Sequence, residues 1–113
     1  LVVDDVGSVA GFELGYKLEQ RPGFHKKANS GFMQMIDRNT IKLRVFERGV
    51  GETKACGTGA CAAVVVGQQQ GLLDTNVTTQ LTGGNLAIQW QGPGHHLFMD
   101  GPAPHVYEGH IKL

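Results

Sequence analysis

The sequence predicts a single α+β domain, in which a mostly antiparallel sheet wraps around one buried central helix. Three observations support this prediction. The length of 113 residues is that of one domain, since domains usually contain about 100 to 150 residues. Segments with strand-like alternation occur both before and after residues 55–66. That stretch is rich in alanine and valine on all sides, as expected of a helix enclosed by a domain.

Four segments precede this helix. In chain order they are a strand, a helix and two strands joined by a turn, at residues 1–3, 8–21, 29–36 and 40–48. The last strand alternates most clearly, because Ile41, Leu43 and Val45 share one face and charged residues occupy the other. Glu47 has the same parity, which predicts a carboxylate on the core-facing side. A charge is rare at such a place unless it is paired or used in function.

Residues 49–54 are expected to form a glycine-rich loop between this strand and the helix, and Gly71 is expected to end the helix. The remaining chain is predicted to be β-structure, beginning with a hairpin around Gly83-Gly84-Asn85. The expected strands are 77–82, 86–90, 96–99 and 106–113.

Composition excludes several functional classes. Ten Lys and Arg balance ten Asp and Glu, so no net field attracts the protein to nucleic acid or to anionic membranes. No apolar run approaches the roughly 20 residues that cross a bilayer. A hydrophobic content of 41% with 18% charged residues excludes a disordered chain.

The two cysteines, Cys56 and Cys61, lie in the predicted helix. Five helical steps turn them about 140° apart, so they cannot form a disulfide within the helix. A reduced thiol with a special role is the preferred interpretation, and we expect a cytoplasmic protein. Cys61, inside the alanine run, is expected to be a small buried hydrophobe.

Cys56 falls at the N-terminal end of the helix, among glycines. The first four N–H groups of a helix have no partner within it, and the helix dipole places about half a positive charge there. Such a position favours a thiolate and binds an anion, and glycines let a carboxylate or phosphate reach the amides. Arg48 is the candidate ion-pair partner of Glu47. This junction of strand and helix is therefore the strongest candidate site in the sequence.

Other patterns indicate no further site. Gly49-x-Gly51 lacks the Gly-Lys-Ser/Thr sequence of a phosphate loop. The four histidines of the C-terminal part match no standard zinc spacing, and we expect them at the surface: His95, His96, His105 and His110. No metal site is predicted.

The stretch from Arg44 to Ala63, RVFERGVGETKACGTGACAA, resembles the signature of diaminopimelate epimerases around their second catalytic cysteine. The segments NSGFMQ at 29–34 and GPGH at 92–95 resemble the same family at the expected distances. The resemblance covers essentially the whole chain. It implies an enzyme, without cofactor, that interconverts LL- and meso-2,6-diaminopimelate on the bacterial route to lysine and peptidoglycan.

In that family a cysteine thiolate removes the α-proton from one face of the substrate, and a second cysteine returns a proton to the other face. The resemblance makes Cys56 the catalytic acid and base, with Glu47 helping it to change protonation state. Arg48 is the expected partner of the distal carboxylate, and Gly57 and Thr58 would offer amides to the reacting carboxylate. The positions that hold the substrate correspond to Asn29, Glu47, Arg48, Gly57 and Thr58.

The family enzyme consists of two similar halves, and each gives one cysteine. This chain resembles the second half, so residues 1–101 are expected to form a C-terminal catalytic half-domain. Residues 102–113 are expected to form a strand that crosses to the missing N-terminal half. Cys61 points elsewhere on the helix and cannot replace the absent cysteine, so the isolated chain is expected to be inactive.

Without the other half, the apolar side chains of the last strand would be exposed, and exposed strand edges favour pairing between chains. We therefore expect a homodimer, formed through residues such as Val106, Tyr107 and Ile111. Two alternatives stay open. One is another cofactor-free racemase of similar fold, such as the proline racemase group. The other is a non-catalytic half-domain that binds a small carboxylate or a partner.

Overall fold

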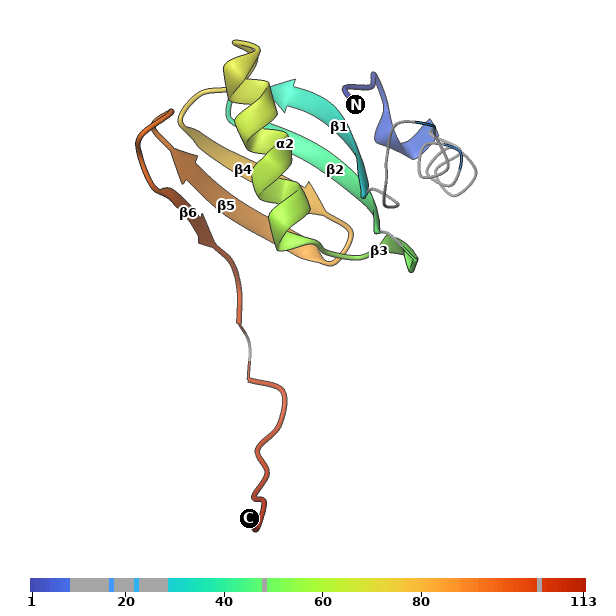
Figure 1. The fold of residues 1–113 in the computed structure, drawn as a ribbon, viewed down its shortest axis with the longest axis vertical. Coiled ribbons are helices and arrows are strands. Elements are labelled where there is room, and N and C mark those ends of the chain that lie inside the picture. Colours follow the sequence, from blue (N-terminus) through green and yellow to red (C-terminus); the bar gives the residue numbers. More distant parts are fainter. Residues whose placement is uncertain (9–16, 18–21, 23–28, 48, 104) are drawn as a thin grey trace.

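The computed structural model describes residues 1–8, 17, 22, 29–47, 49–103 and 105–113. These residues form a six-stranded sheet with one long helix against one face (Figure 1). The helices are the 3-10 turn η1 (Val6–Ser8) and α2 (Gly57–Gln69). The strands are β1 (Ser30–Asp37), β2 (Thr40–Glu47), β3 (Gly51–Thr53), β4 (Asn76–Leu81), β5 (Gly84–Trp90) and β6 (Leu97–Asp100).

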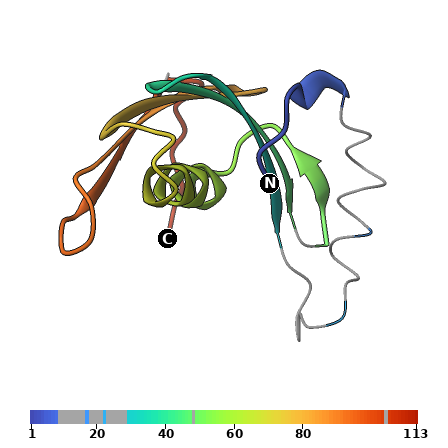
Figure 2. The ribbon, with the colours of Figure 1, turned by 90° about the horizontal axis from the view of Figure 1, so that it is seen from above.

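The sheet has the order β1-β2-β4-β5-β6, and β3 pairs with β2 off this path. All these pairs are antiparallel except β2 and β4. The exception follows from the connection, because a chain that returns through a helix enters the next strand in the original direction. The sheet arches over α2 (Figure 2), which confirms the predicted α+β fold.

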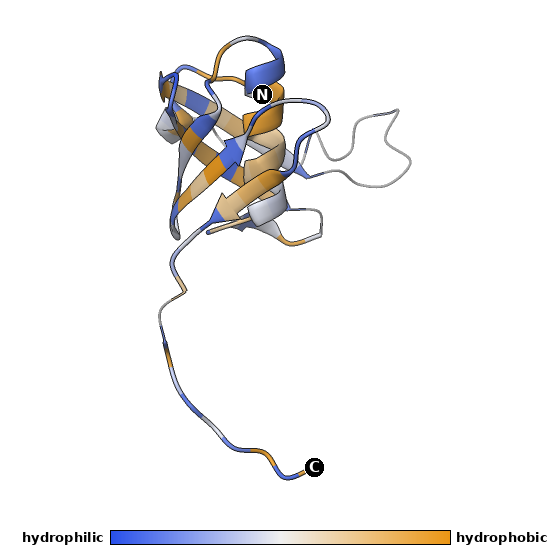
Figure 3. Ribbon diagram, turned by 90° about the vertical axis from the view of Figure 1, so that its left-hand side faces the viewer, coloured by the Kyte–Doolittle hydropathy of each residue, from blue (hydrophilic) through white to orange (hydrophobic). Residues whose placement is uncertain are grey.

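The concave face of the sheet packs against α2, and Figure 3 shows hydrophobic residues gathered in these elements. Gly67 allows the closest approach, since a Cβ at this position would lie 2.4 Å from Cδ1 of Leu73. The buried residues of this cluster are Met33, Ile41, Leu43, Val45, Ala60, Val64, Leu73, Val77, Leu81 and Ile88.

The opposite side of α2 is open, which differs from the expectation of an enclosed helix. Ala62 is exposed, and the side chain of Val66 is 45% exposed. The described strands cover only one side of the helix (Figure 2). Among the described residues, nothing covers the apolar surface on this other side of the helix completely.

Three segments before α2 differ from the predicted elements or lie outside the described residues. Residues 1–3 form only an isolated bridge, Val2 with Met33, rather than a full strand. The predicted loop at 49–54 contains β3, because its residues pair with β2. The predicted helix at 8–21 lies almost entirely outside the described residues.

The prediction of a strand at 106–113 is wrong for this structure. The described residues 105–113 form no helix or strand, and the tail runs away from the body (Figure 1). Val106, Tyr107 and Ile111 are 84%, 83% and 84% exposed. A strand requires a neighbour for its backbone hydrogen bonds, and this segment has none within the described part of the chain. None of the helices described is long and apolar enough to cross a membrane.

An ion pair fixes β3 to β2 on the face turned away from α2. Arg44 donates from Nε to Oε1 of Glu52 at 2.6 Å and from Nη2 to Oε2 at 2.9 Å. A further bond from Nη1 reaches the carbonyl of Val6 at 2.7 Å. The hydrogen bond from Arg44 lowers the pKa of Glu52, and the same bond raises the pKa of Arg44.

This pair predicts a pH-dependent contribution to stability. Because the pKa of Glu52 is lower in the folded protein, the contribution is complete above the unfolded value of about 4.3 and is lost as the pH falls through the folded value. We expect Glu52→Gln to lower the free energy of unfolding by about 1 kcal/mol at pH 7. The difference should shrink below about pH 4 in urea titrations. Asp4→Asn, at an exposed residue near the N-terminus, is the control, and a difference independent of pH would contradict the assignment.

Candidate functional site

Cys56 is the N-cap residue of α2. Its backbone is extended, with φ −147° and ψ 105°, and its Sγ accepts a hydrogen bond from the N–H of Gly59 at 3.4 Å. The hydroxyl of Thr58 lies 3.5 Å from the same sulfur. Oxygen-bearing side chains usually occupy this position. The structure thus places the thiol where the sequence predicted, at the positive end of the helix.

The sulfur of Cys56 lies close to the main chain of the first turn of α2, where Gly57 and Gly59 have no side chains. A Cβ on Gly59 would lie 3.2 Å from Sγ of Cys56 and 3.4 Å from both methyl groups of Val45. A Cβ on Gly57 would lie 3.2 Å from Sδ of Met99, a residue of β6. Glycines at both positions therefore permit the close approach of β2 and β6 to the first turn of α2. The role of Met99 as a neighbour of this turn was not predicted, because β6 is distant in sequence.

The amides of Gly57 and Thr58 precede the first helical hydrogen bond. That bond runs from the N–H of Ala60 to the carbonyl of Cys56 at 3.0 Å. N–H groups before it cannot find a partner within the helix. Such groups at the start of a helix can bind an anion such as a carboxylate.

Cys61 faces a different environment. Its Sγ lies 3.9 Å from Sδ of Met99, and its side chain packs against the core. Burial raises the pKa of the Cys61 thiol, and negative charge on Cys56 raises it further. Both cysteines are free. Cys61 is therefore a partly buried thiol that packs against the core, close to its expected role as a small buried hydrophobe.

Glu47 lies at the end of β2, on the face of Leu43 and Val45 that packs against α2. Its side chain is partly buried, and Oε1 accepts a hydrogen bond from Oγ1 of Thr53 at 2.7 Å. The parity predicted from the sequence is correct. The suggested partner, Arg48, lies outside the described residues. Thr53 was missed because its segment was interpreted as a loop, although Gly51-Glu52-Thr53 is long enough to pair with β2.

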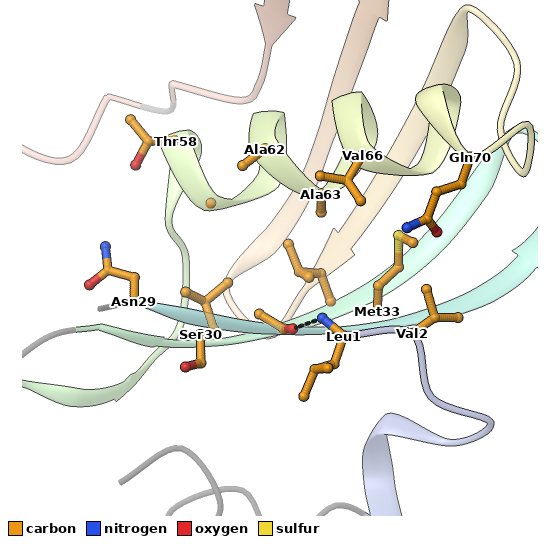
Figure 4. A pocket seen from close by; sticks show the side chains of 14 residues that line it. Leu1, Val2, Asn29, Ser30, Met33, Thr58, Ala62, Ala63, Val66 and Gln70 are labelled. Atoms are coloured by element: carbon orange, nitrogen blue, oxygen red, sulfur yellow. Dashed lines mark hydrogen bonds between the residues drawn. The ribbon is translucent and has the colours of Figure 1, made fainter. Parts of the chain in front are cut away.

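A groove of about 630 Å³ runs between β1 and α2 (Figure 4). Asn29 and Thr58 line one end from opposite sides, and Gly59 belongs to the same wall. Much of the remaining wall is apolar and includes the open side of α2, with Ala62 and Val66. The structure therefore brings Asn29 to the same groove end as the first turn of α2.

Val45 connects the two parts of the candidate site. It touches the turn that carries the Cys56 sulfur, and Glu47 lies two residues further along the same face of β2. Cys56 and the first amides of α2 thus lie against β2, the strand that carries Glu47. In the part of the chain that the structure describes, no three His, Cys, Asp or Glu side chains are grouped to hold a metal ion.

The chain is similar to the crystal structure of the Bacillus anthracis phenazine biosynthesis protein of the PhzF family, with 22% sequence identity and a TM-score of 0.60. The match covers 87% of this chain and 32% of the other, so the chain spans about a third of that protein's length. At this identity the likeness establishes the shared α+β fold.

The family model described as diaminopimelate epimerase matches residues 1–106, which is nearly the whole chain. That range contains Cys56, its flanking glycines and both strands that lead to it. The chain therefore belongs to the diaminopimelate epimerase family, a family of isomerases.

Proposed function

We propose that this chain is a catalytic half-domain of a cofactor-independent epimerase that interconverts LL- and meso-2,6-diaminopimelate. The observation that carries the proposal is the position of Cys56 as N-cap of α2, with Sγ accepting the N–H of Gly59. A thiol at a helix N-terminus is favoured as thiolate and can act as a base. The family match supplies the substrate class.

The substrate carboxylate next to the reacting carbon binds the amides of Gly57 and Thr58 in this proposal. These donors and the helix dipole also stabilise the negative charge that develops when the α-proton leaves. The Cα–H bond breaks, its electron pair moves toward the carboxylate, and the proton forms an S–H bond on Cys56. One device thus binds the substrate, favours the thiolate and stabilises the carbanion.

The other candidate residues hold the rest of the substrate. Glu47 presents a carboxylate that suits an ammonium group, and in this proposal it helps Cys56 to change protonation state. Asn29, at the groove end facing Thr58, offers an amide for hydrogen bonds. Arg48 is proposed to bind the distal carboxylate on the strength of its position in the family motif.

A second thiol is needed on the opposite face of the α-carbon. Cys61 does not suit this role, because its sulfur lies against Met99, its side chain packs against the core, and it belongs to the same helix as Cys56. We propose that a partner half-domain supplies the second cysteine. The exposed tail at 102–113 is proposed to bind that partner as a strand, since its apolar side chains have no cover within the described chain.

The test of the reaction is exchange of the α-proton of diaminopimelate in D2O, followed by NMR. The chain mixed with the N-terminal half of a family member should catalyse exchange, and Cys56→Ser should reduce the rate by at least about 10²-fold. Cys61→Ser is the matched control and should stay within a few-fold of wild type. Proline in place of diaminopimelate tests the related racemase. Rapid turnover by the isolated chain, or an active Cys56→Ser protein, would contradict the proposal.

The exposed tail predicts self-association when no partner half is present. The full chain should form dimers at high concentration in light scattering, because unpaired apolar segments pair between copies. Removal of residues 102–113, or the triple change Val106→Ser, Tyr107→Ser and Ile111→Ser, should leave a monomer. A full chain that stays monomeric, or a shortened chain that dimerises equally, would show that the tail is not an association segment.

A further inference from the structure

The short strand β3 presents two side chains to opposite faces of the sheet. Its register against β2 pairs Val45 with Thr53 and Phe46 with Glu52. Successive residues of a strand point in opposite directions. Glu52 accordingly meets Arg44 on the face away from α2, whereas Thr53 meets Glu47 on the face toward α2.

The contact between Thr53 and Glu47 has a defined direction. An ionised carboxylate can only accept hydrogen bonds, so the Thr53 hydroxyl is the donor to Oε1 at 2.7 Å. Threonine is branched at Cβ and has few accessible rotamers. A stiff donor therefore fixes one oxygen of a longer and more flexible side chain, and the other oxygen keeps its capacity to accept.

The donor is itself held in place. The bidentate pair of Arg44 with Glu52 fastens the residue before Thr53 to β2, and Arg44 is tied in turn to the carbonyl of Val6. Thr53 also lies three residues before Cys56 in the chain. The same short strand thus sets the position of the carboxylate and leads directly to the thiol.

We propose that Thr53 is a positioning residue, which holds the carboxylate of Glu47 in place for the ammonium group of the amino-acid substrate. The inference rests on the proposed function, because it assigns Glu47 to substrate binding. Thr53 acts only through Glu47 and touches no reacting atom. A purely structural link between β2 and β3 would stabilise the fold without affecting affinity through Glu47.

The experiment is calorimetric titration, with diaminopimelate, of the full chain mixed with the N-terminal half of a family member, as in the exchange assay. Thr53→Val keeps the shape but removes the donor, and we expect about tenfold weaker binding, the effect of losing a hydrogen bond to a charged group. Thr53→Ser keeps the hydroxyl and should bind within about threefold of wild type. Thr82→Val, at an exposed turn residue, is the control and should bind like wild type. Urea unfolding checks that each variant is folded, and Thr53→Ala replaces Thr53→Val if the latter is not.

A double-mutant cycle separates the two possible roles. In a Glu47→Ala background, Thr53→Val should weaken binding no further, because the residue through which it acts is gone. Binding of Thr53→Val equal to wild type would overturn the positioning role, as would a loss that persists without Glu47. A wild-type mixture of the two halves that takes up no diaminopimelate would instead overturn the proposed function, and the role of Thr53 with it.

Discussion

The first turn of α2 has main-chain N–H groups that no carbonyl of the helix can reach, and the site depends on how this chain uses them. One of them, the N–H of Gly59, donates a hydrogen bond to the sulfur of Cys56 at 3.4 Å. A thiol is a weaker acceptor than the oxygen of serine or aspartate. The chain thus gives up part of the stability of a strong cap at the place where we propose that a thiol acts. A local departure from the most stable choice is typical of functional sites.

The sheet supplies the second part of the site. β2 brings Val45 against the turn that carries the sulfur and places Glu47 further along the same face. The two polar residues of β3 contact β2 on opposite faces of the sheet: Glu52 pairs with Arg44, and Thr53 donates a hydrogen bond to Glu47. The thiol is held by a hydrogen bond from the first turn of its own helix and the carboxylate by one from β3, so each of these partly buried groups has a partner.

Much of this was predictable from the sequence, because it depends on local pattern. Alternation around Ile41 and Leu43 gave the correct strand and the correct face for Glu47, and the glycines beside Cys56 marked the helix start. β3 was missed because three residues carry little periodicity, and its pairing with β2 is a tertiary contact. Thr53 was missed as the partner of Glu47 because it belongs to this short strand. Arg48, which follows Glu47 in the sequence, was the more obvious partner. The tail alternates like a strand, but a strand also needs a neighbour.

The most direct test of the central claim compares the reactivity of the two thiols in the folded chain. Iodoacetamide labelling at pH 7, followed by mass spectrometry of the two cysteines after proteolysis, measures both rates in one sample. Cys56 should react at least about tenfold faster than Cys61, which burial keeps protonated. Diaminopimelate should slow labelling of Cys56 alone. Labelling of Cys61 at an equal or higher rate, or labelling of Cys56 unaffected by diaminopimelate, would contradict a reactive thiol at the start of α2 beside a substrate site.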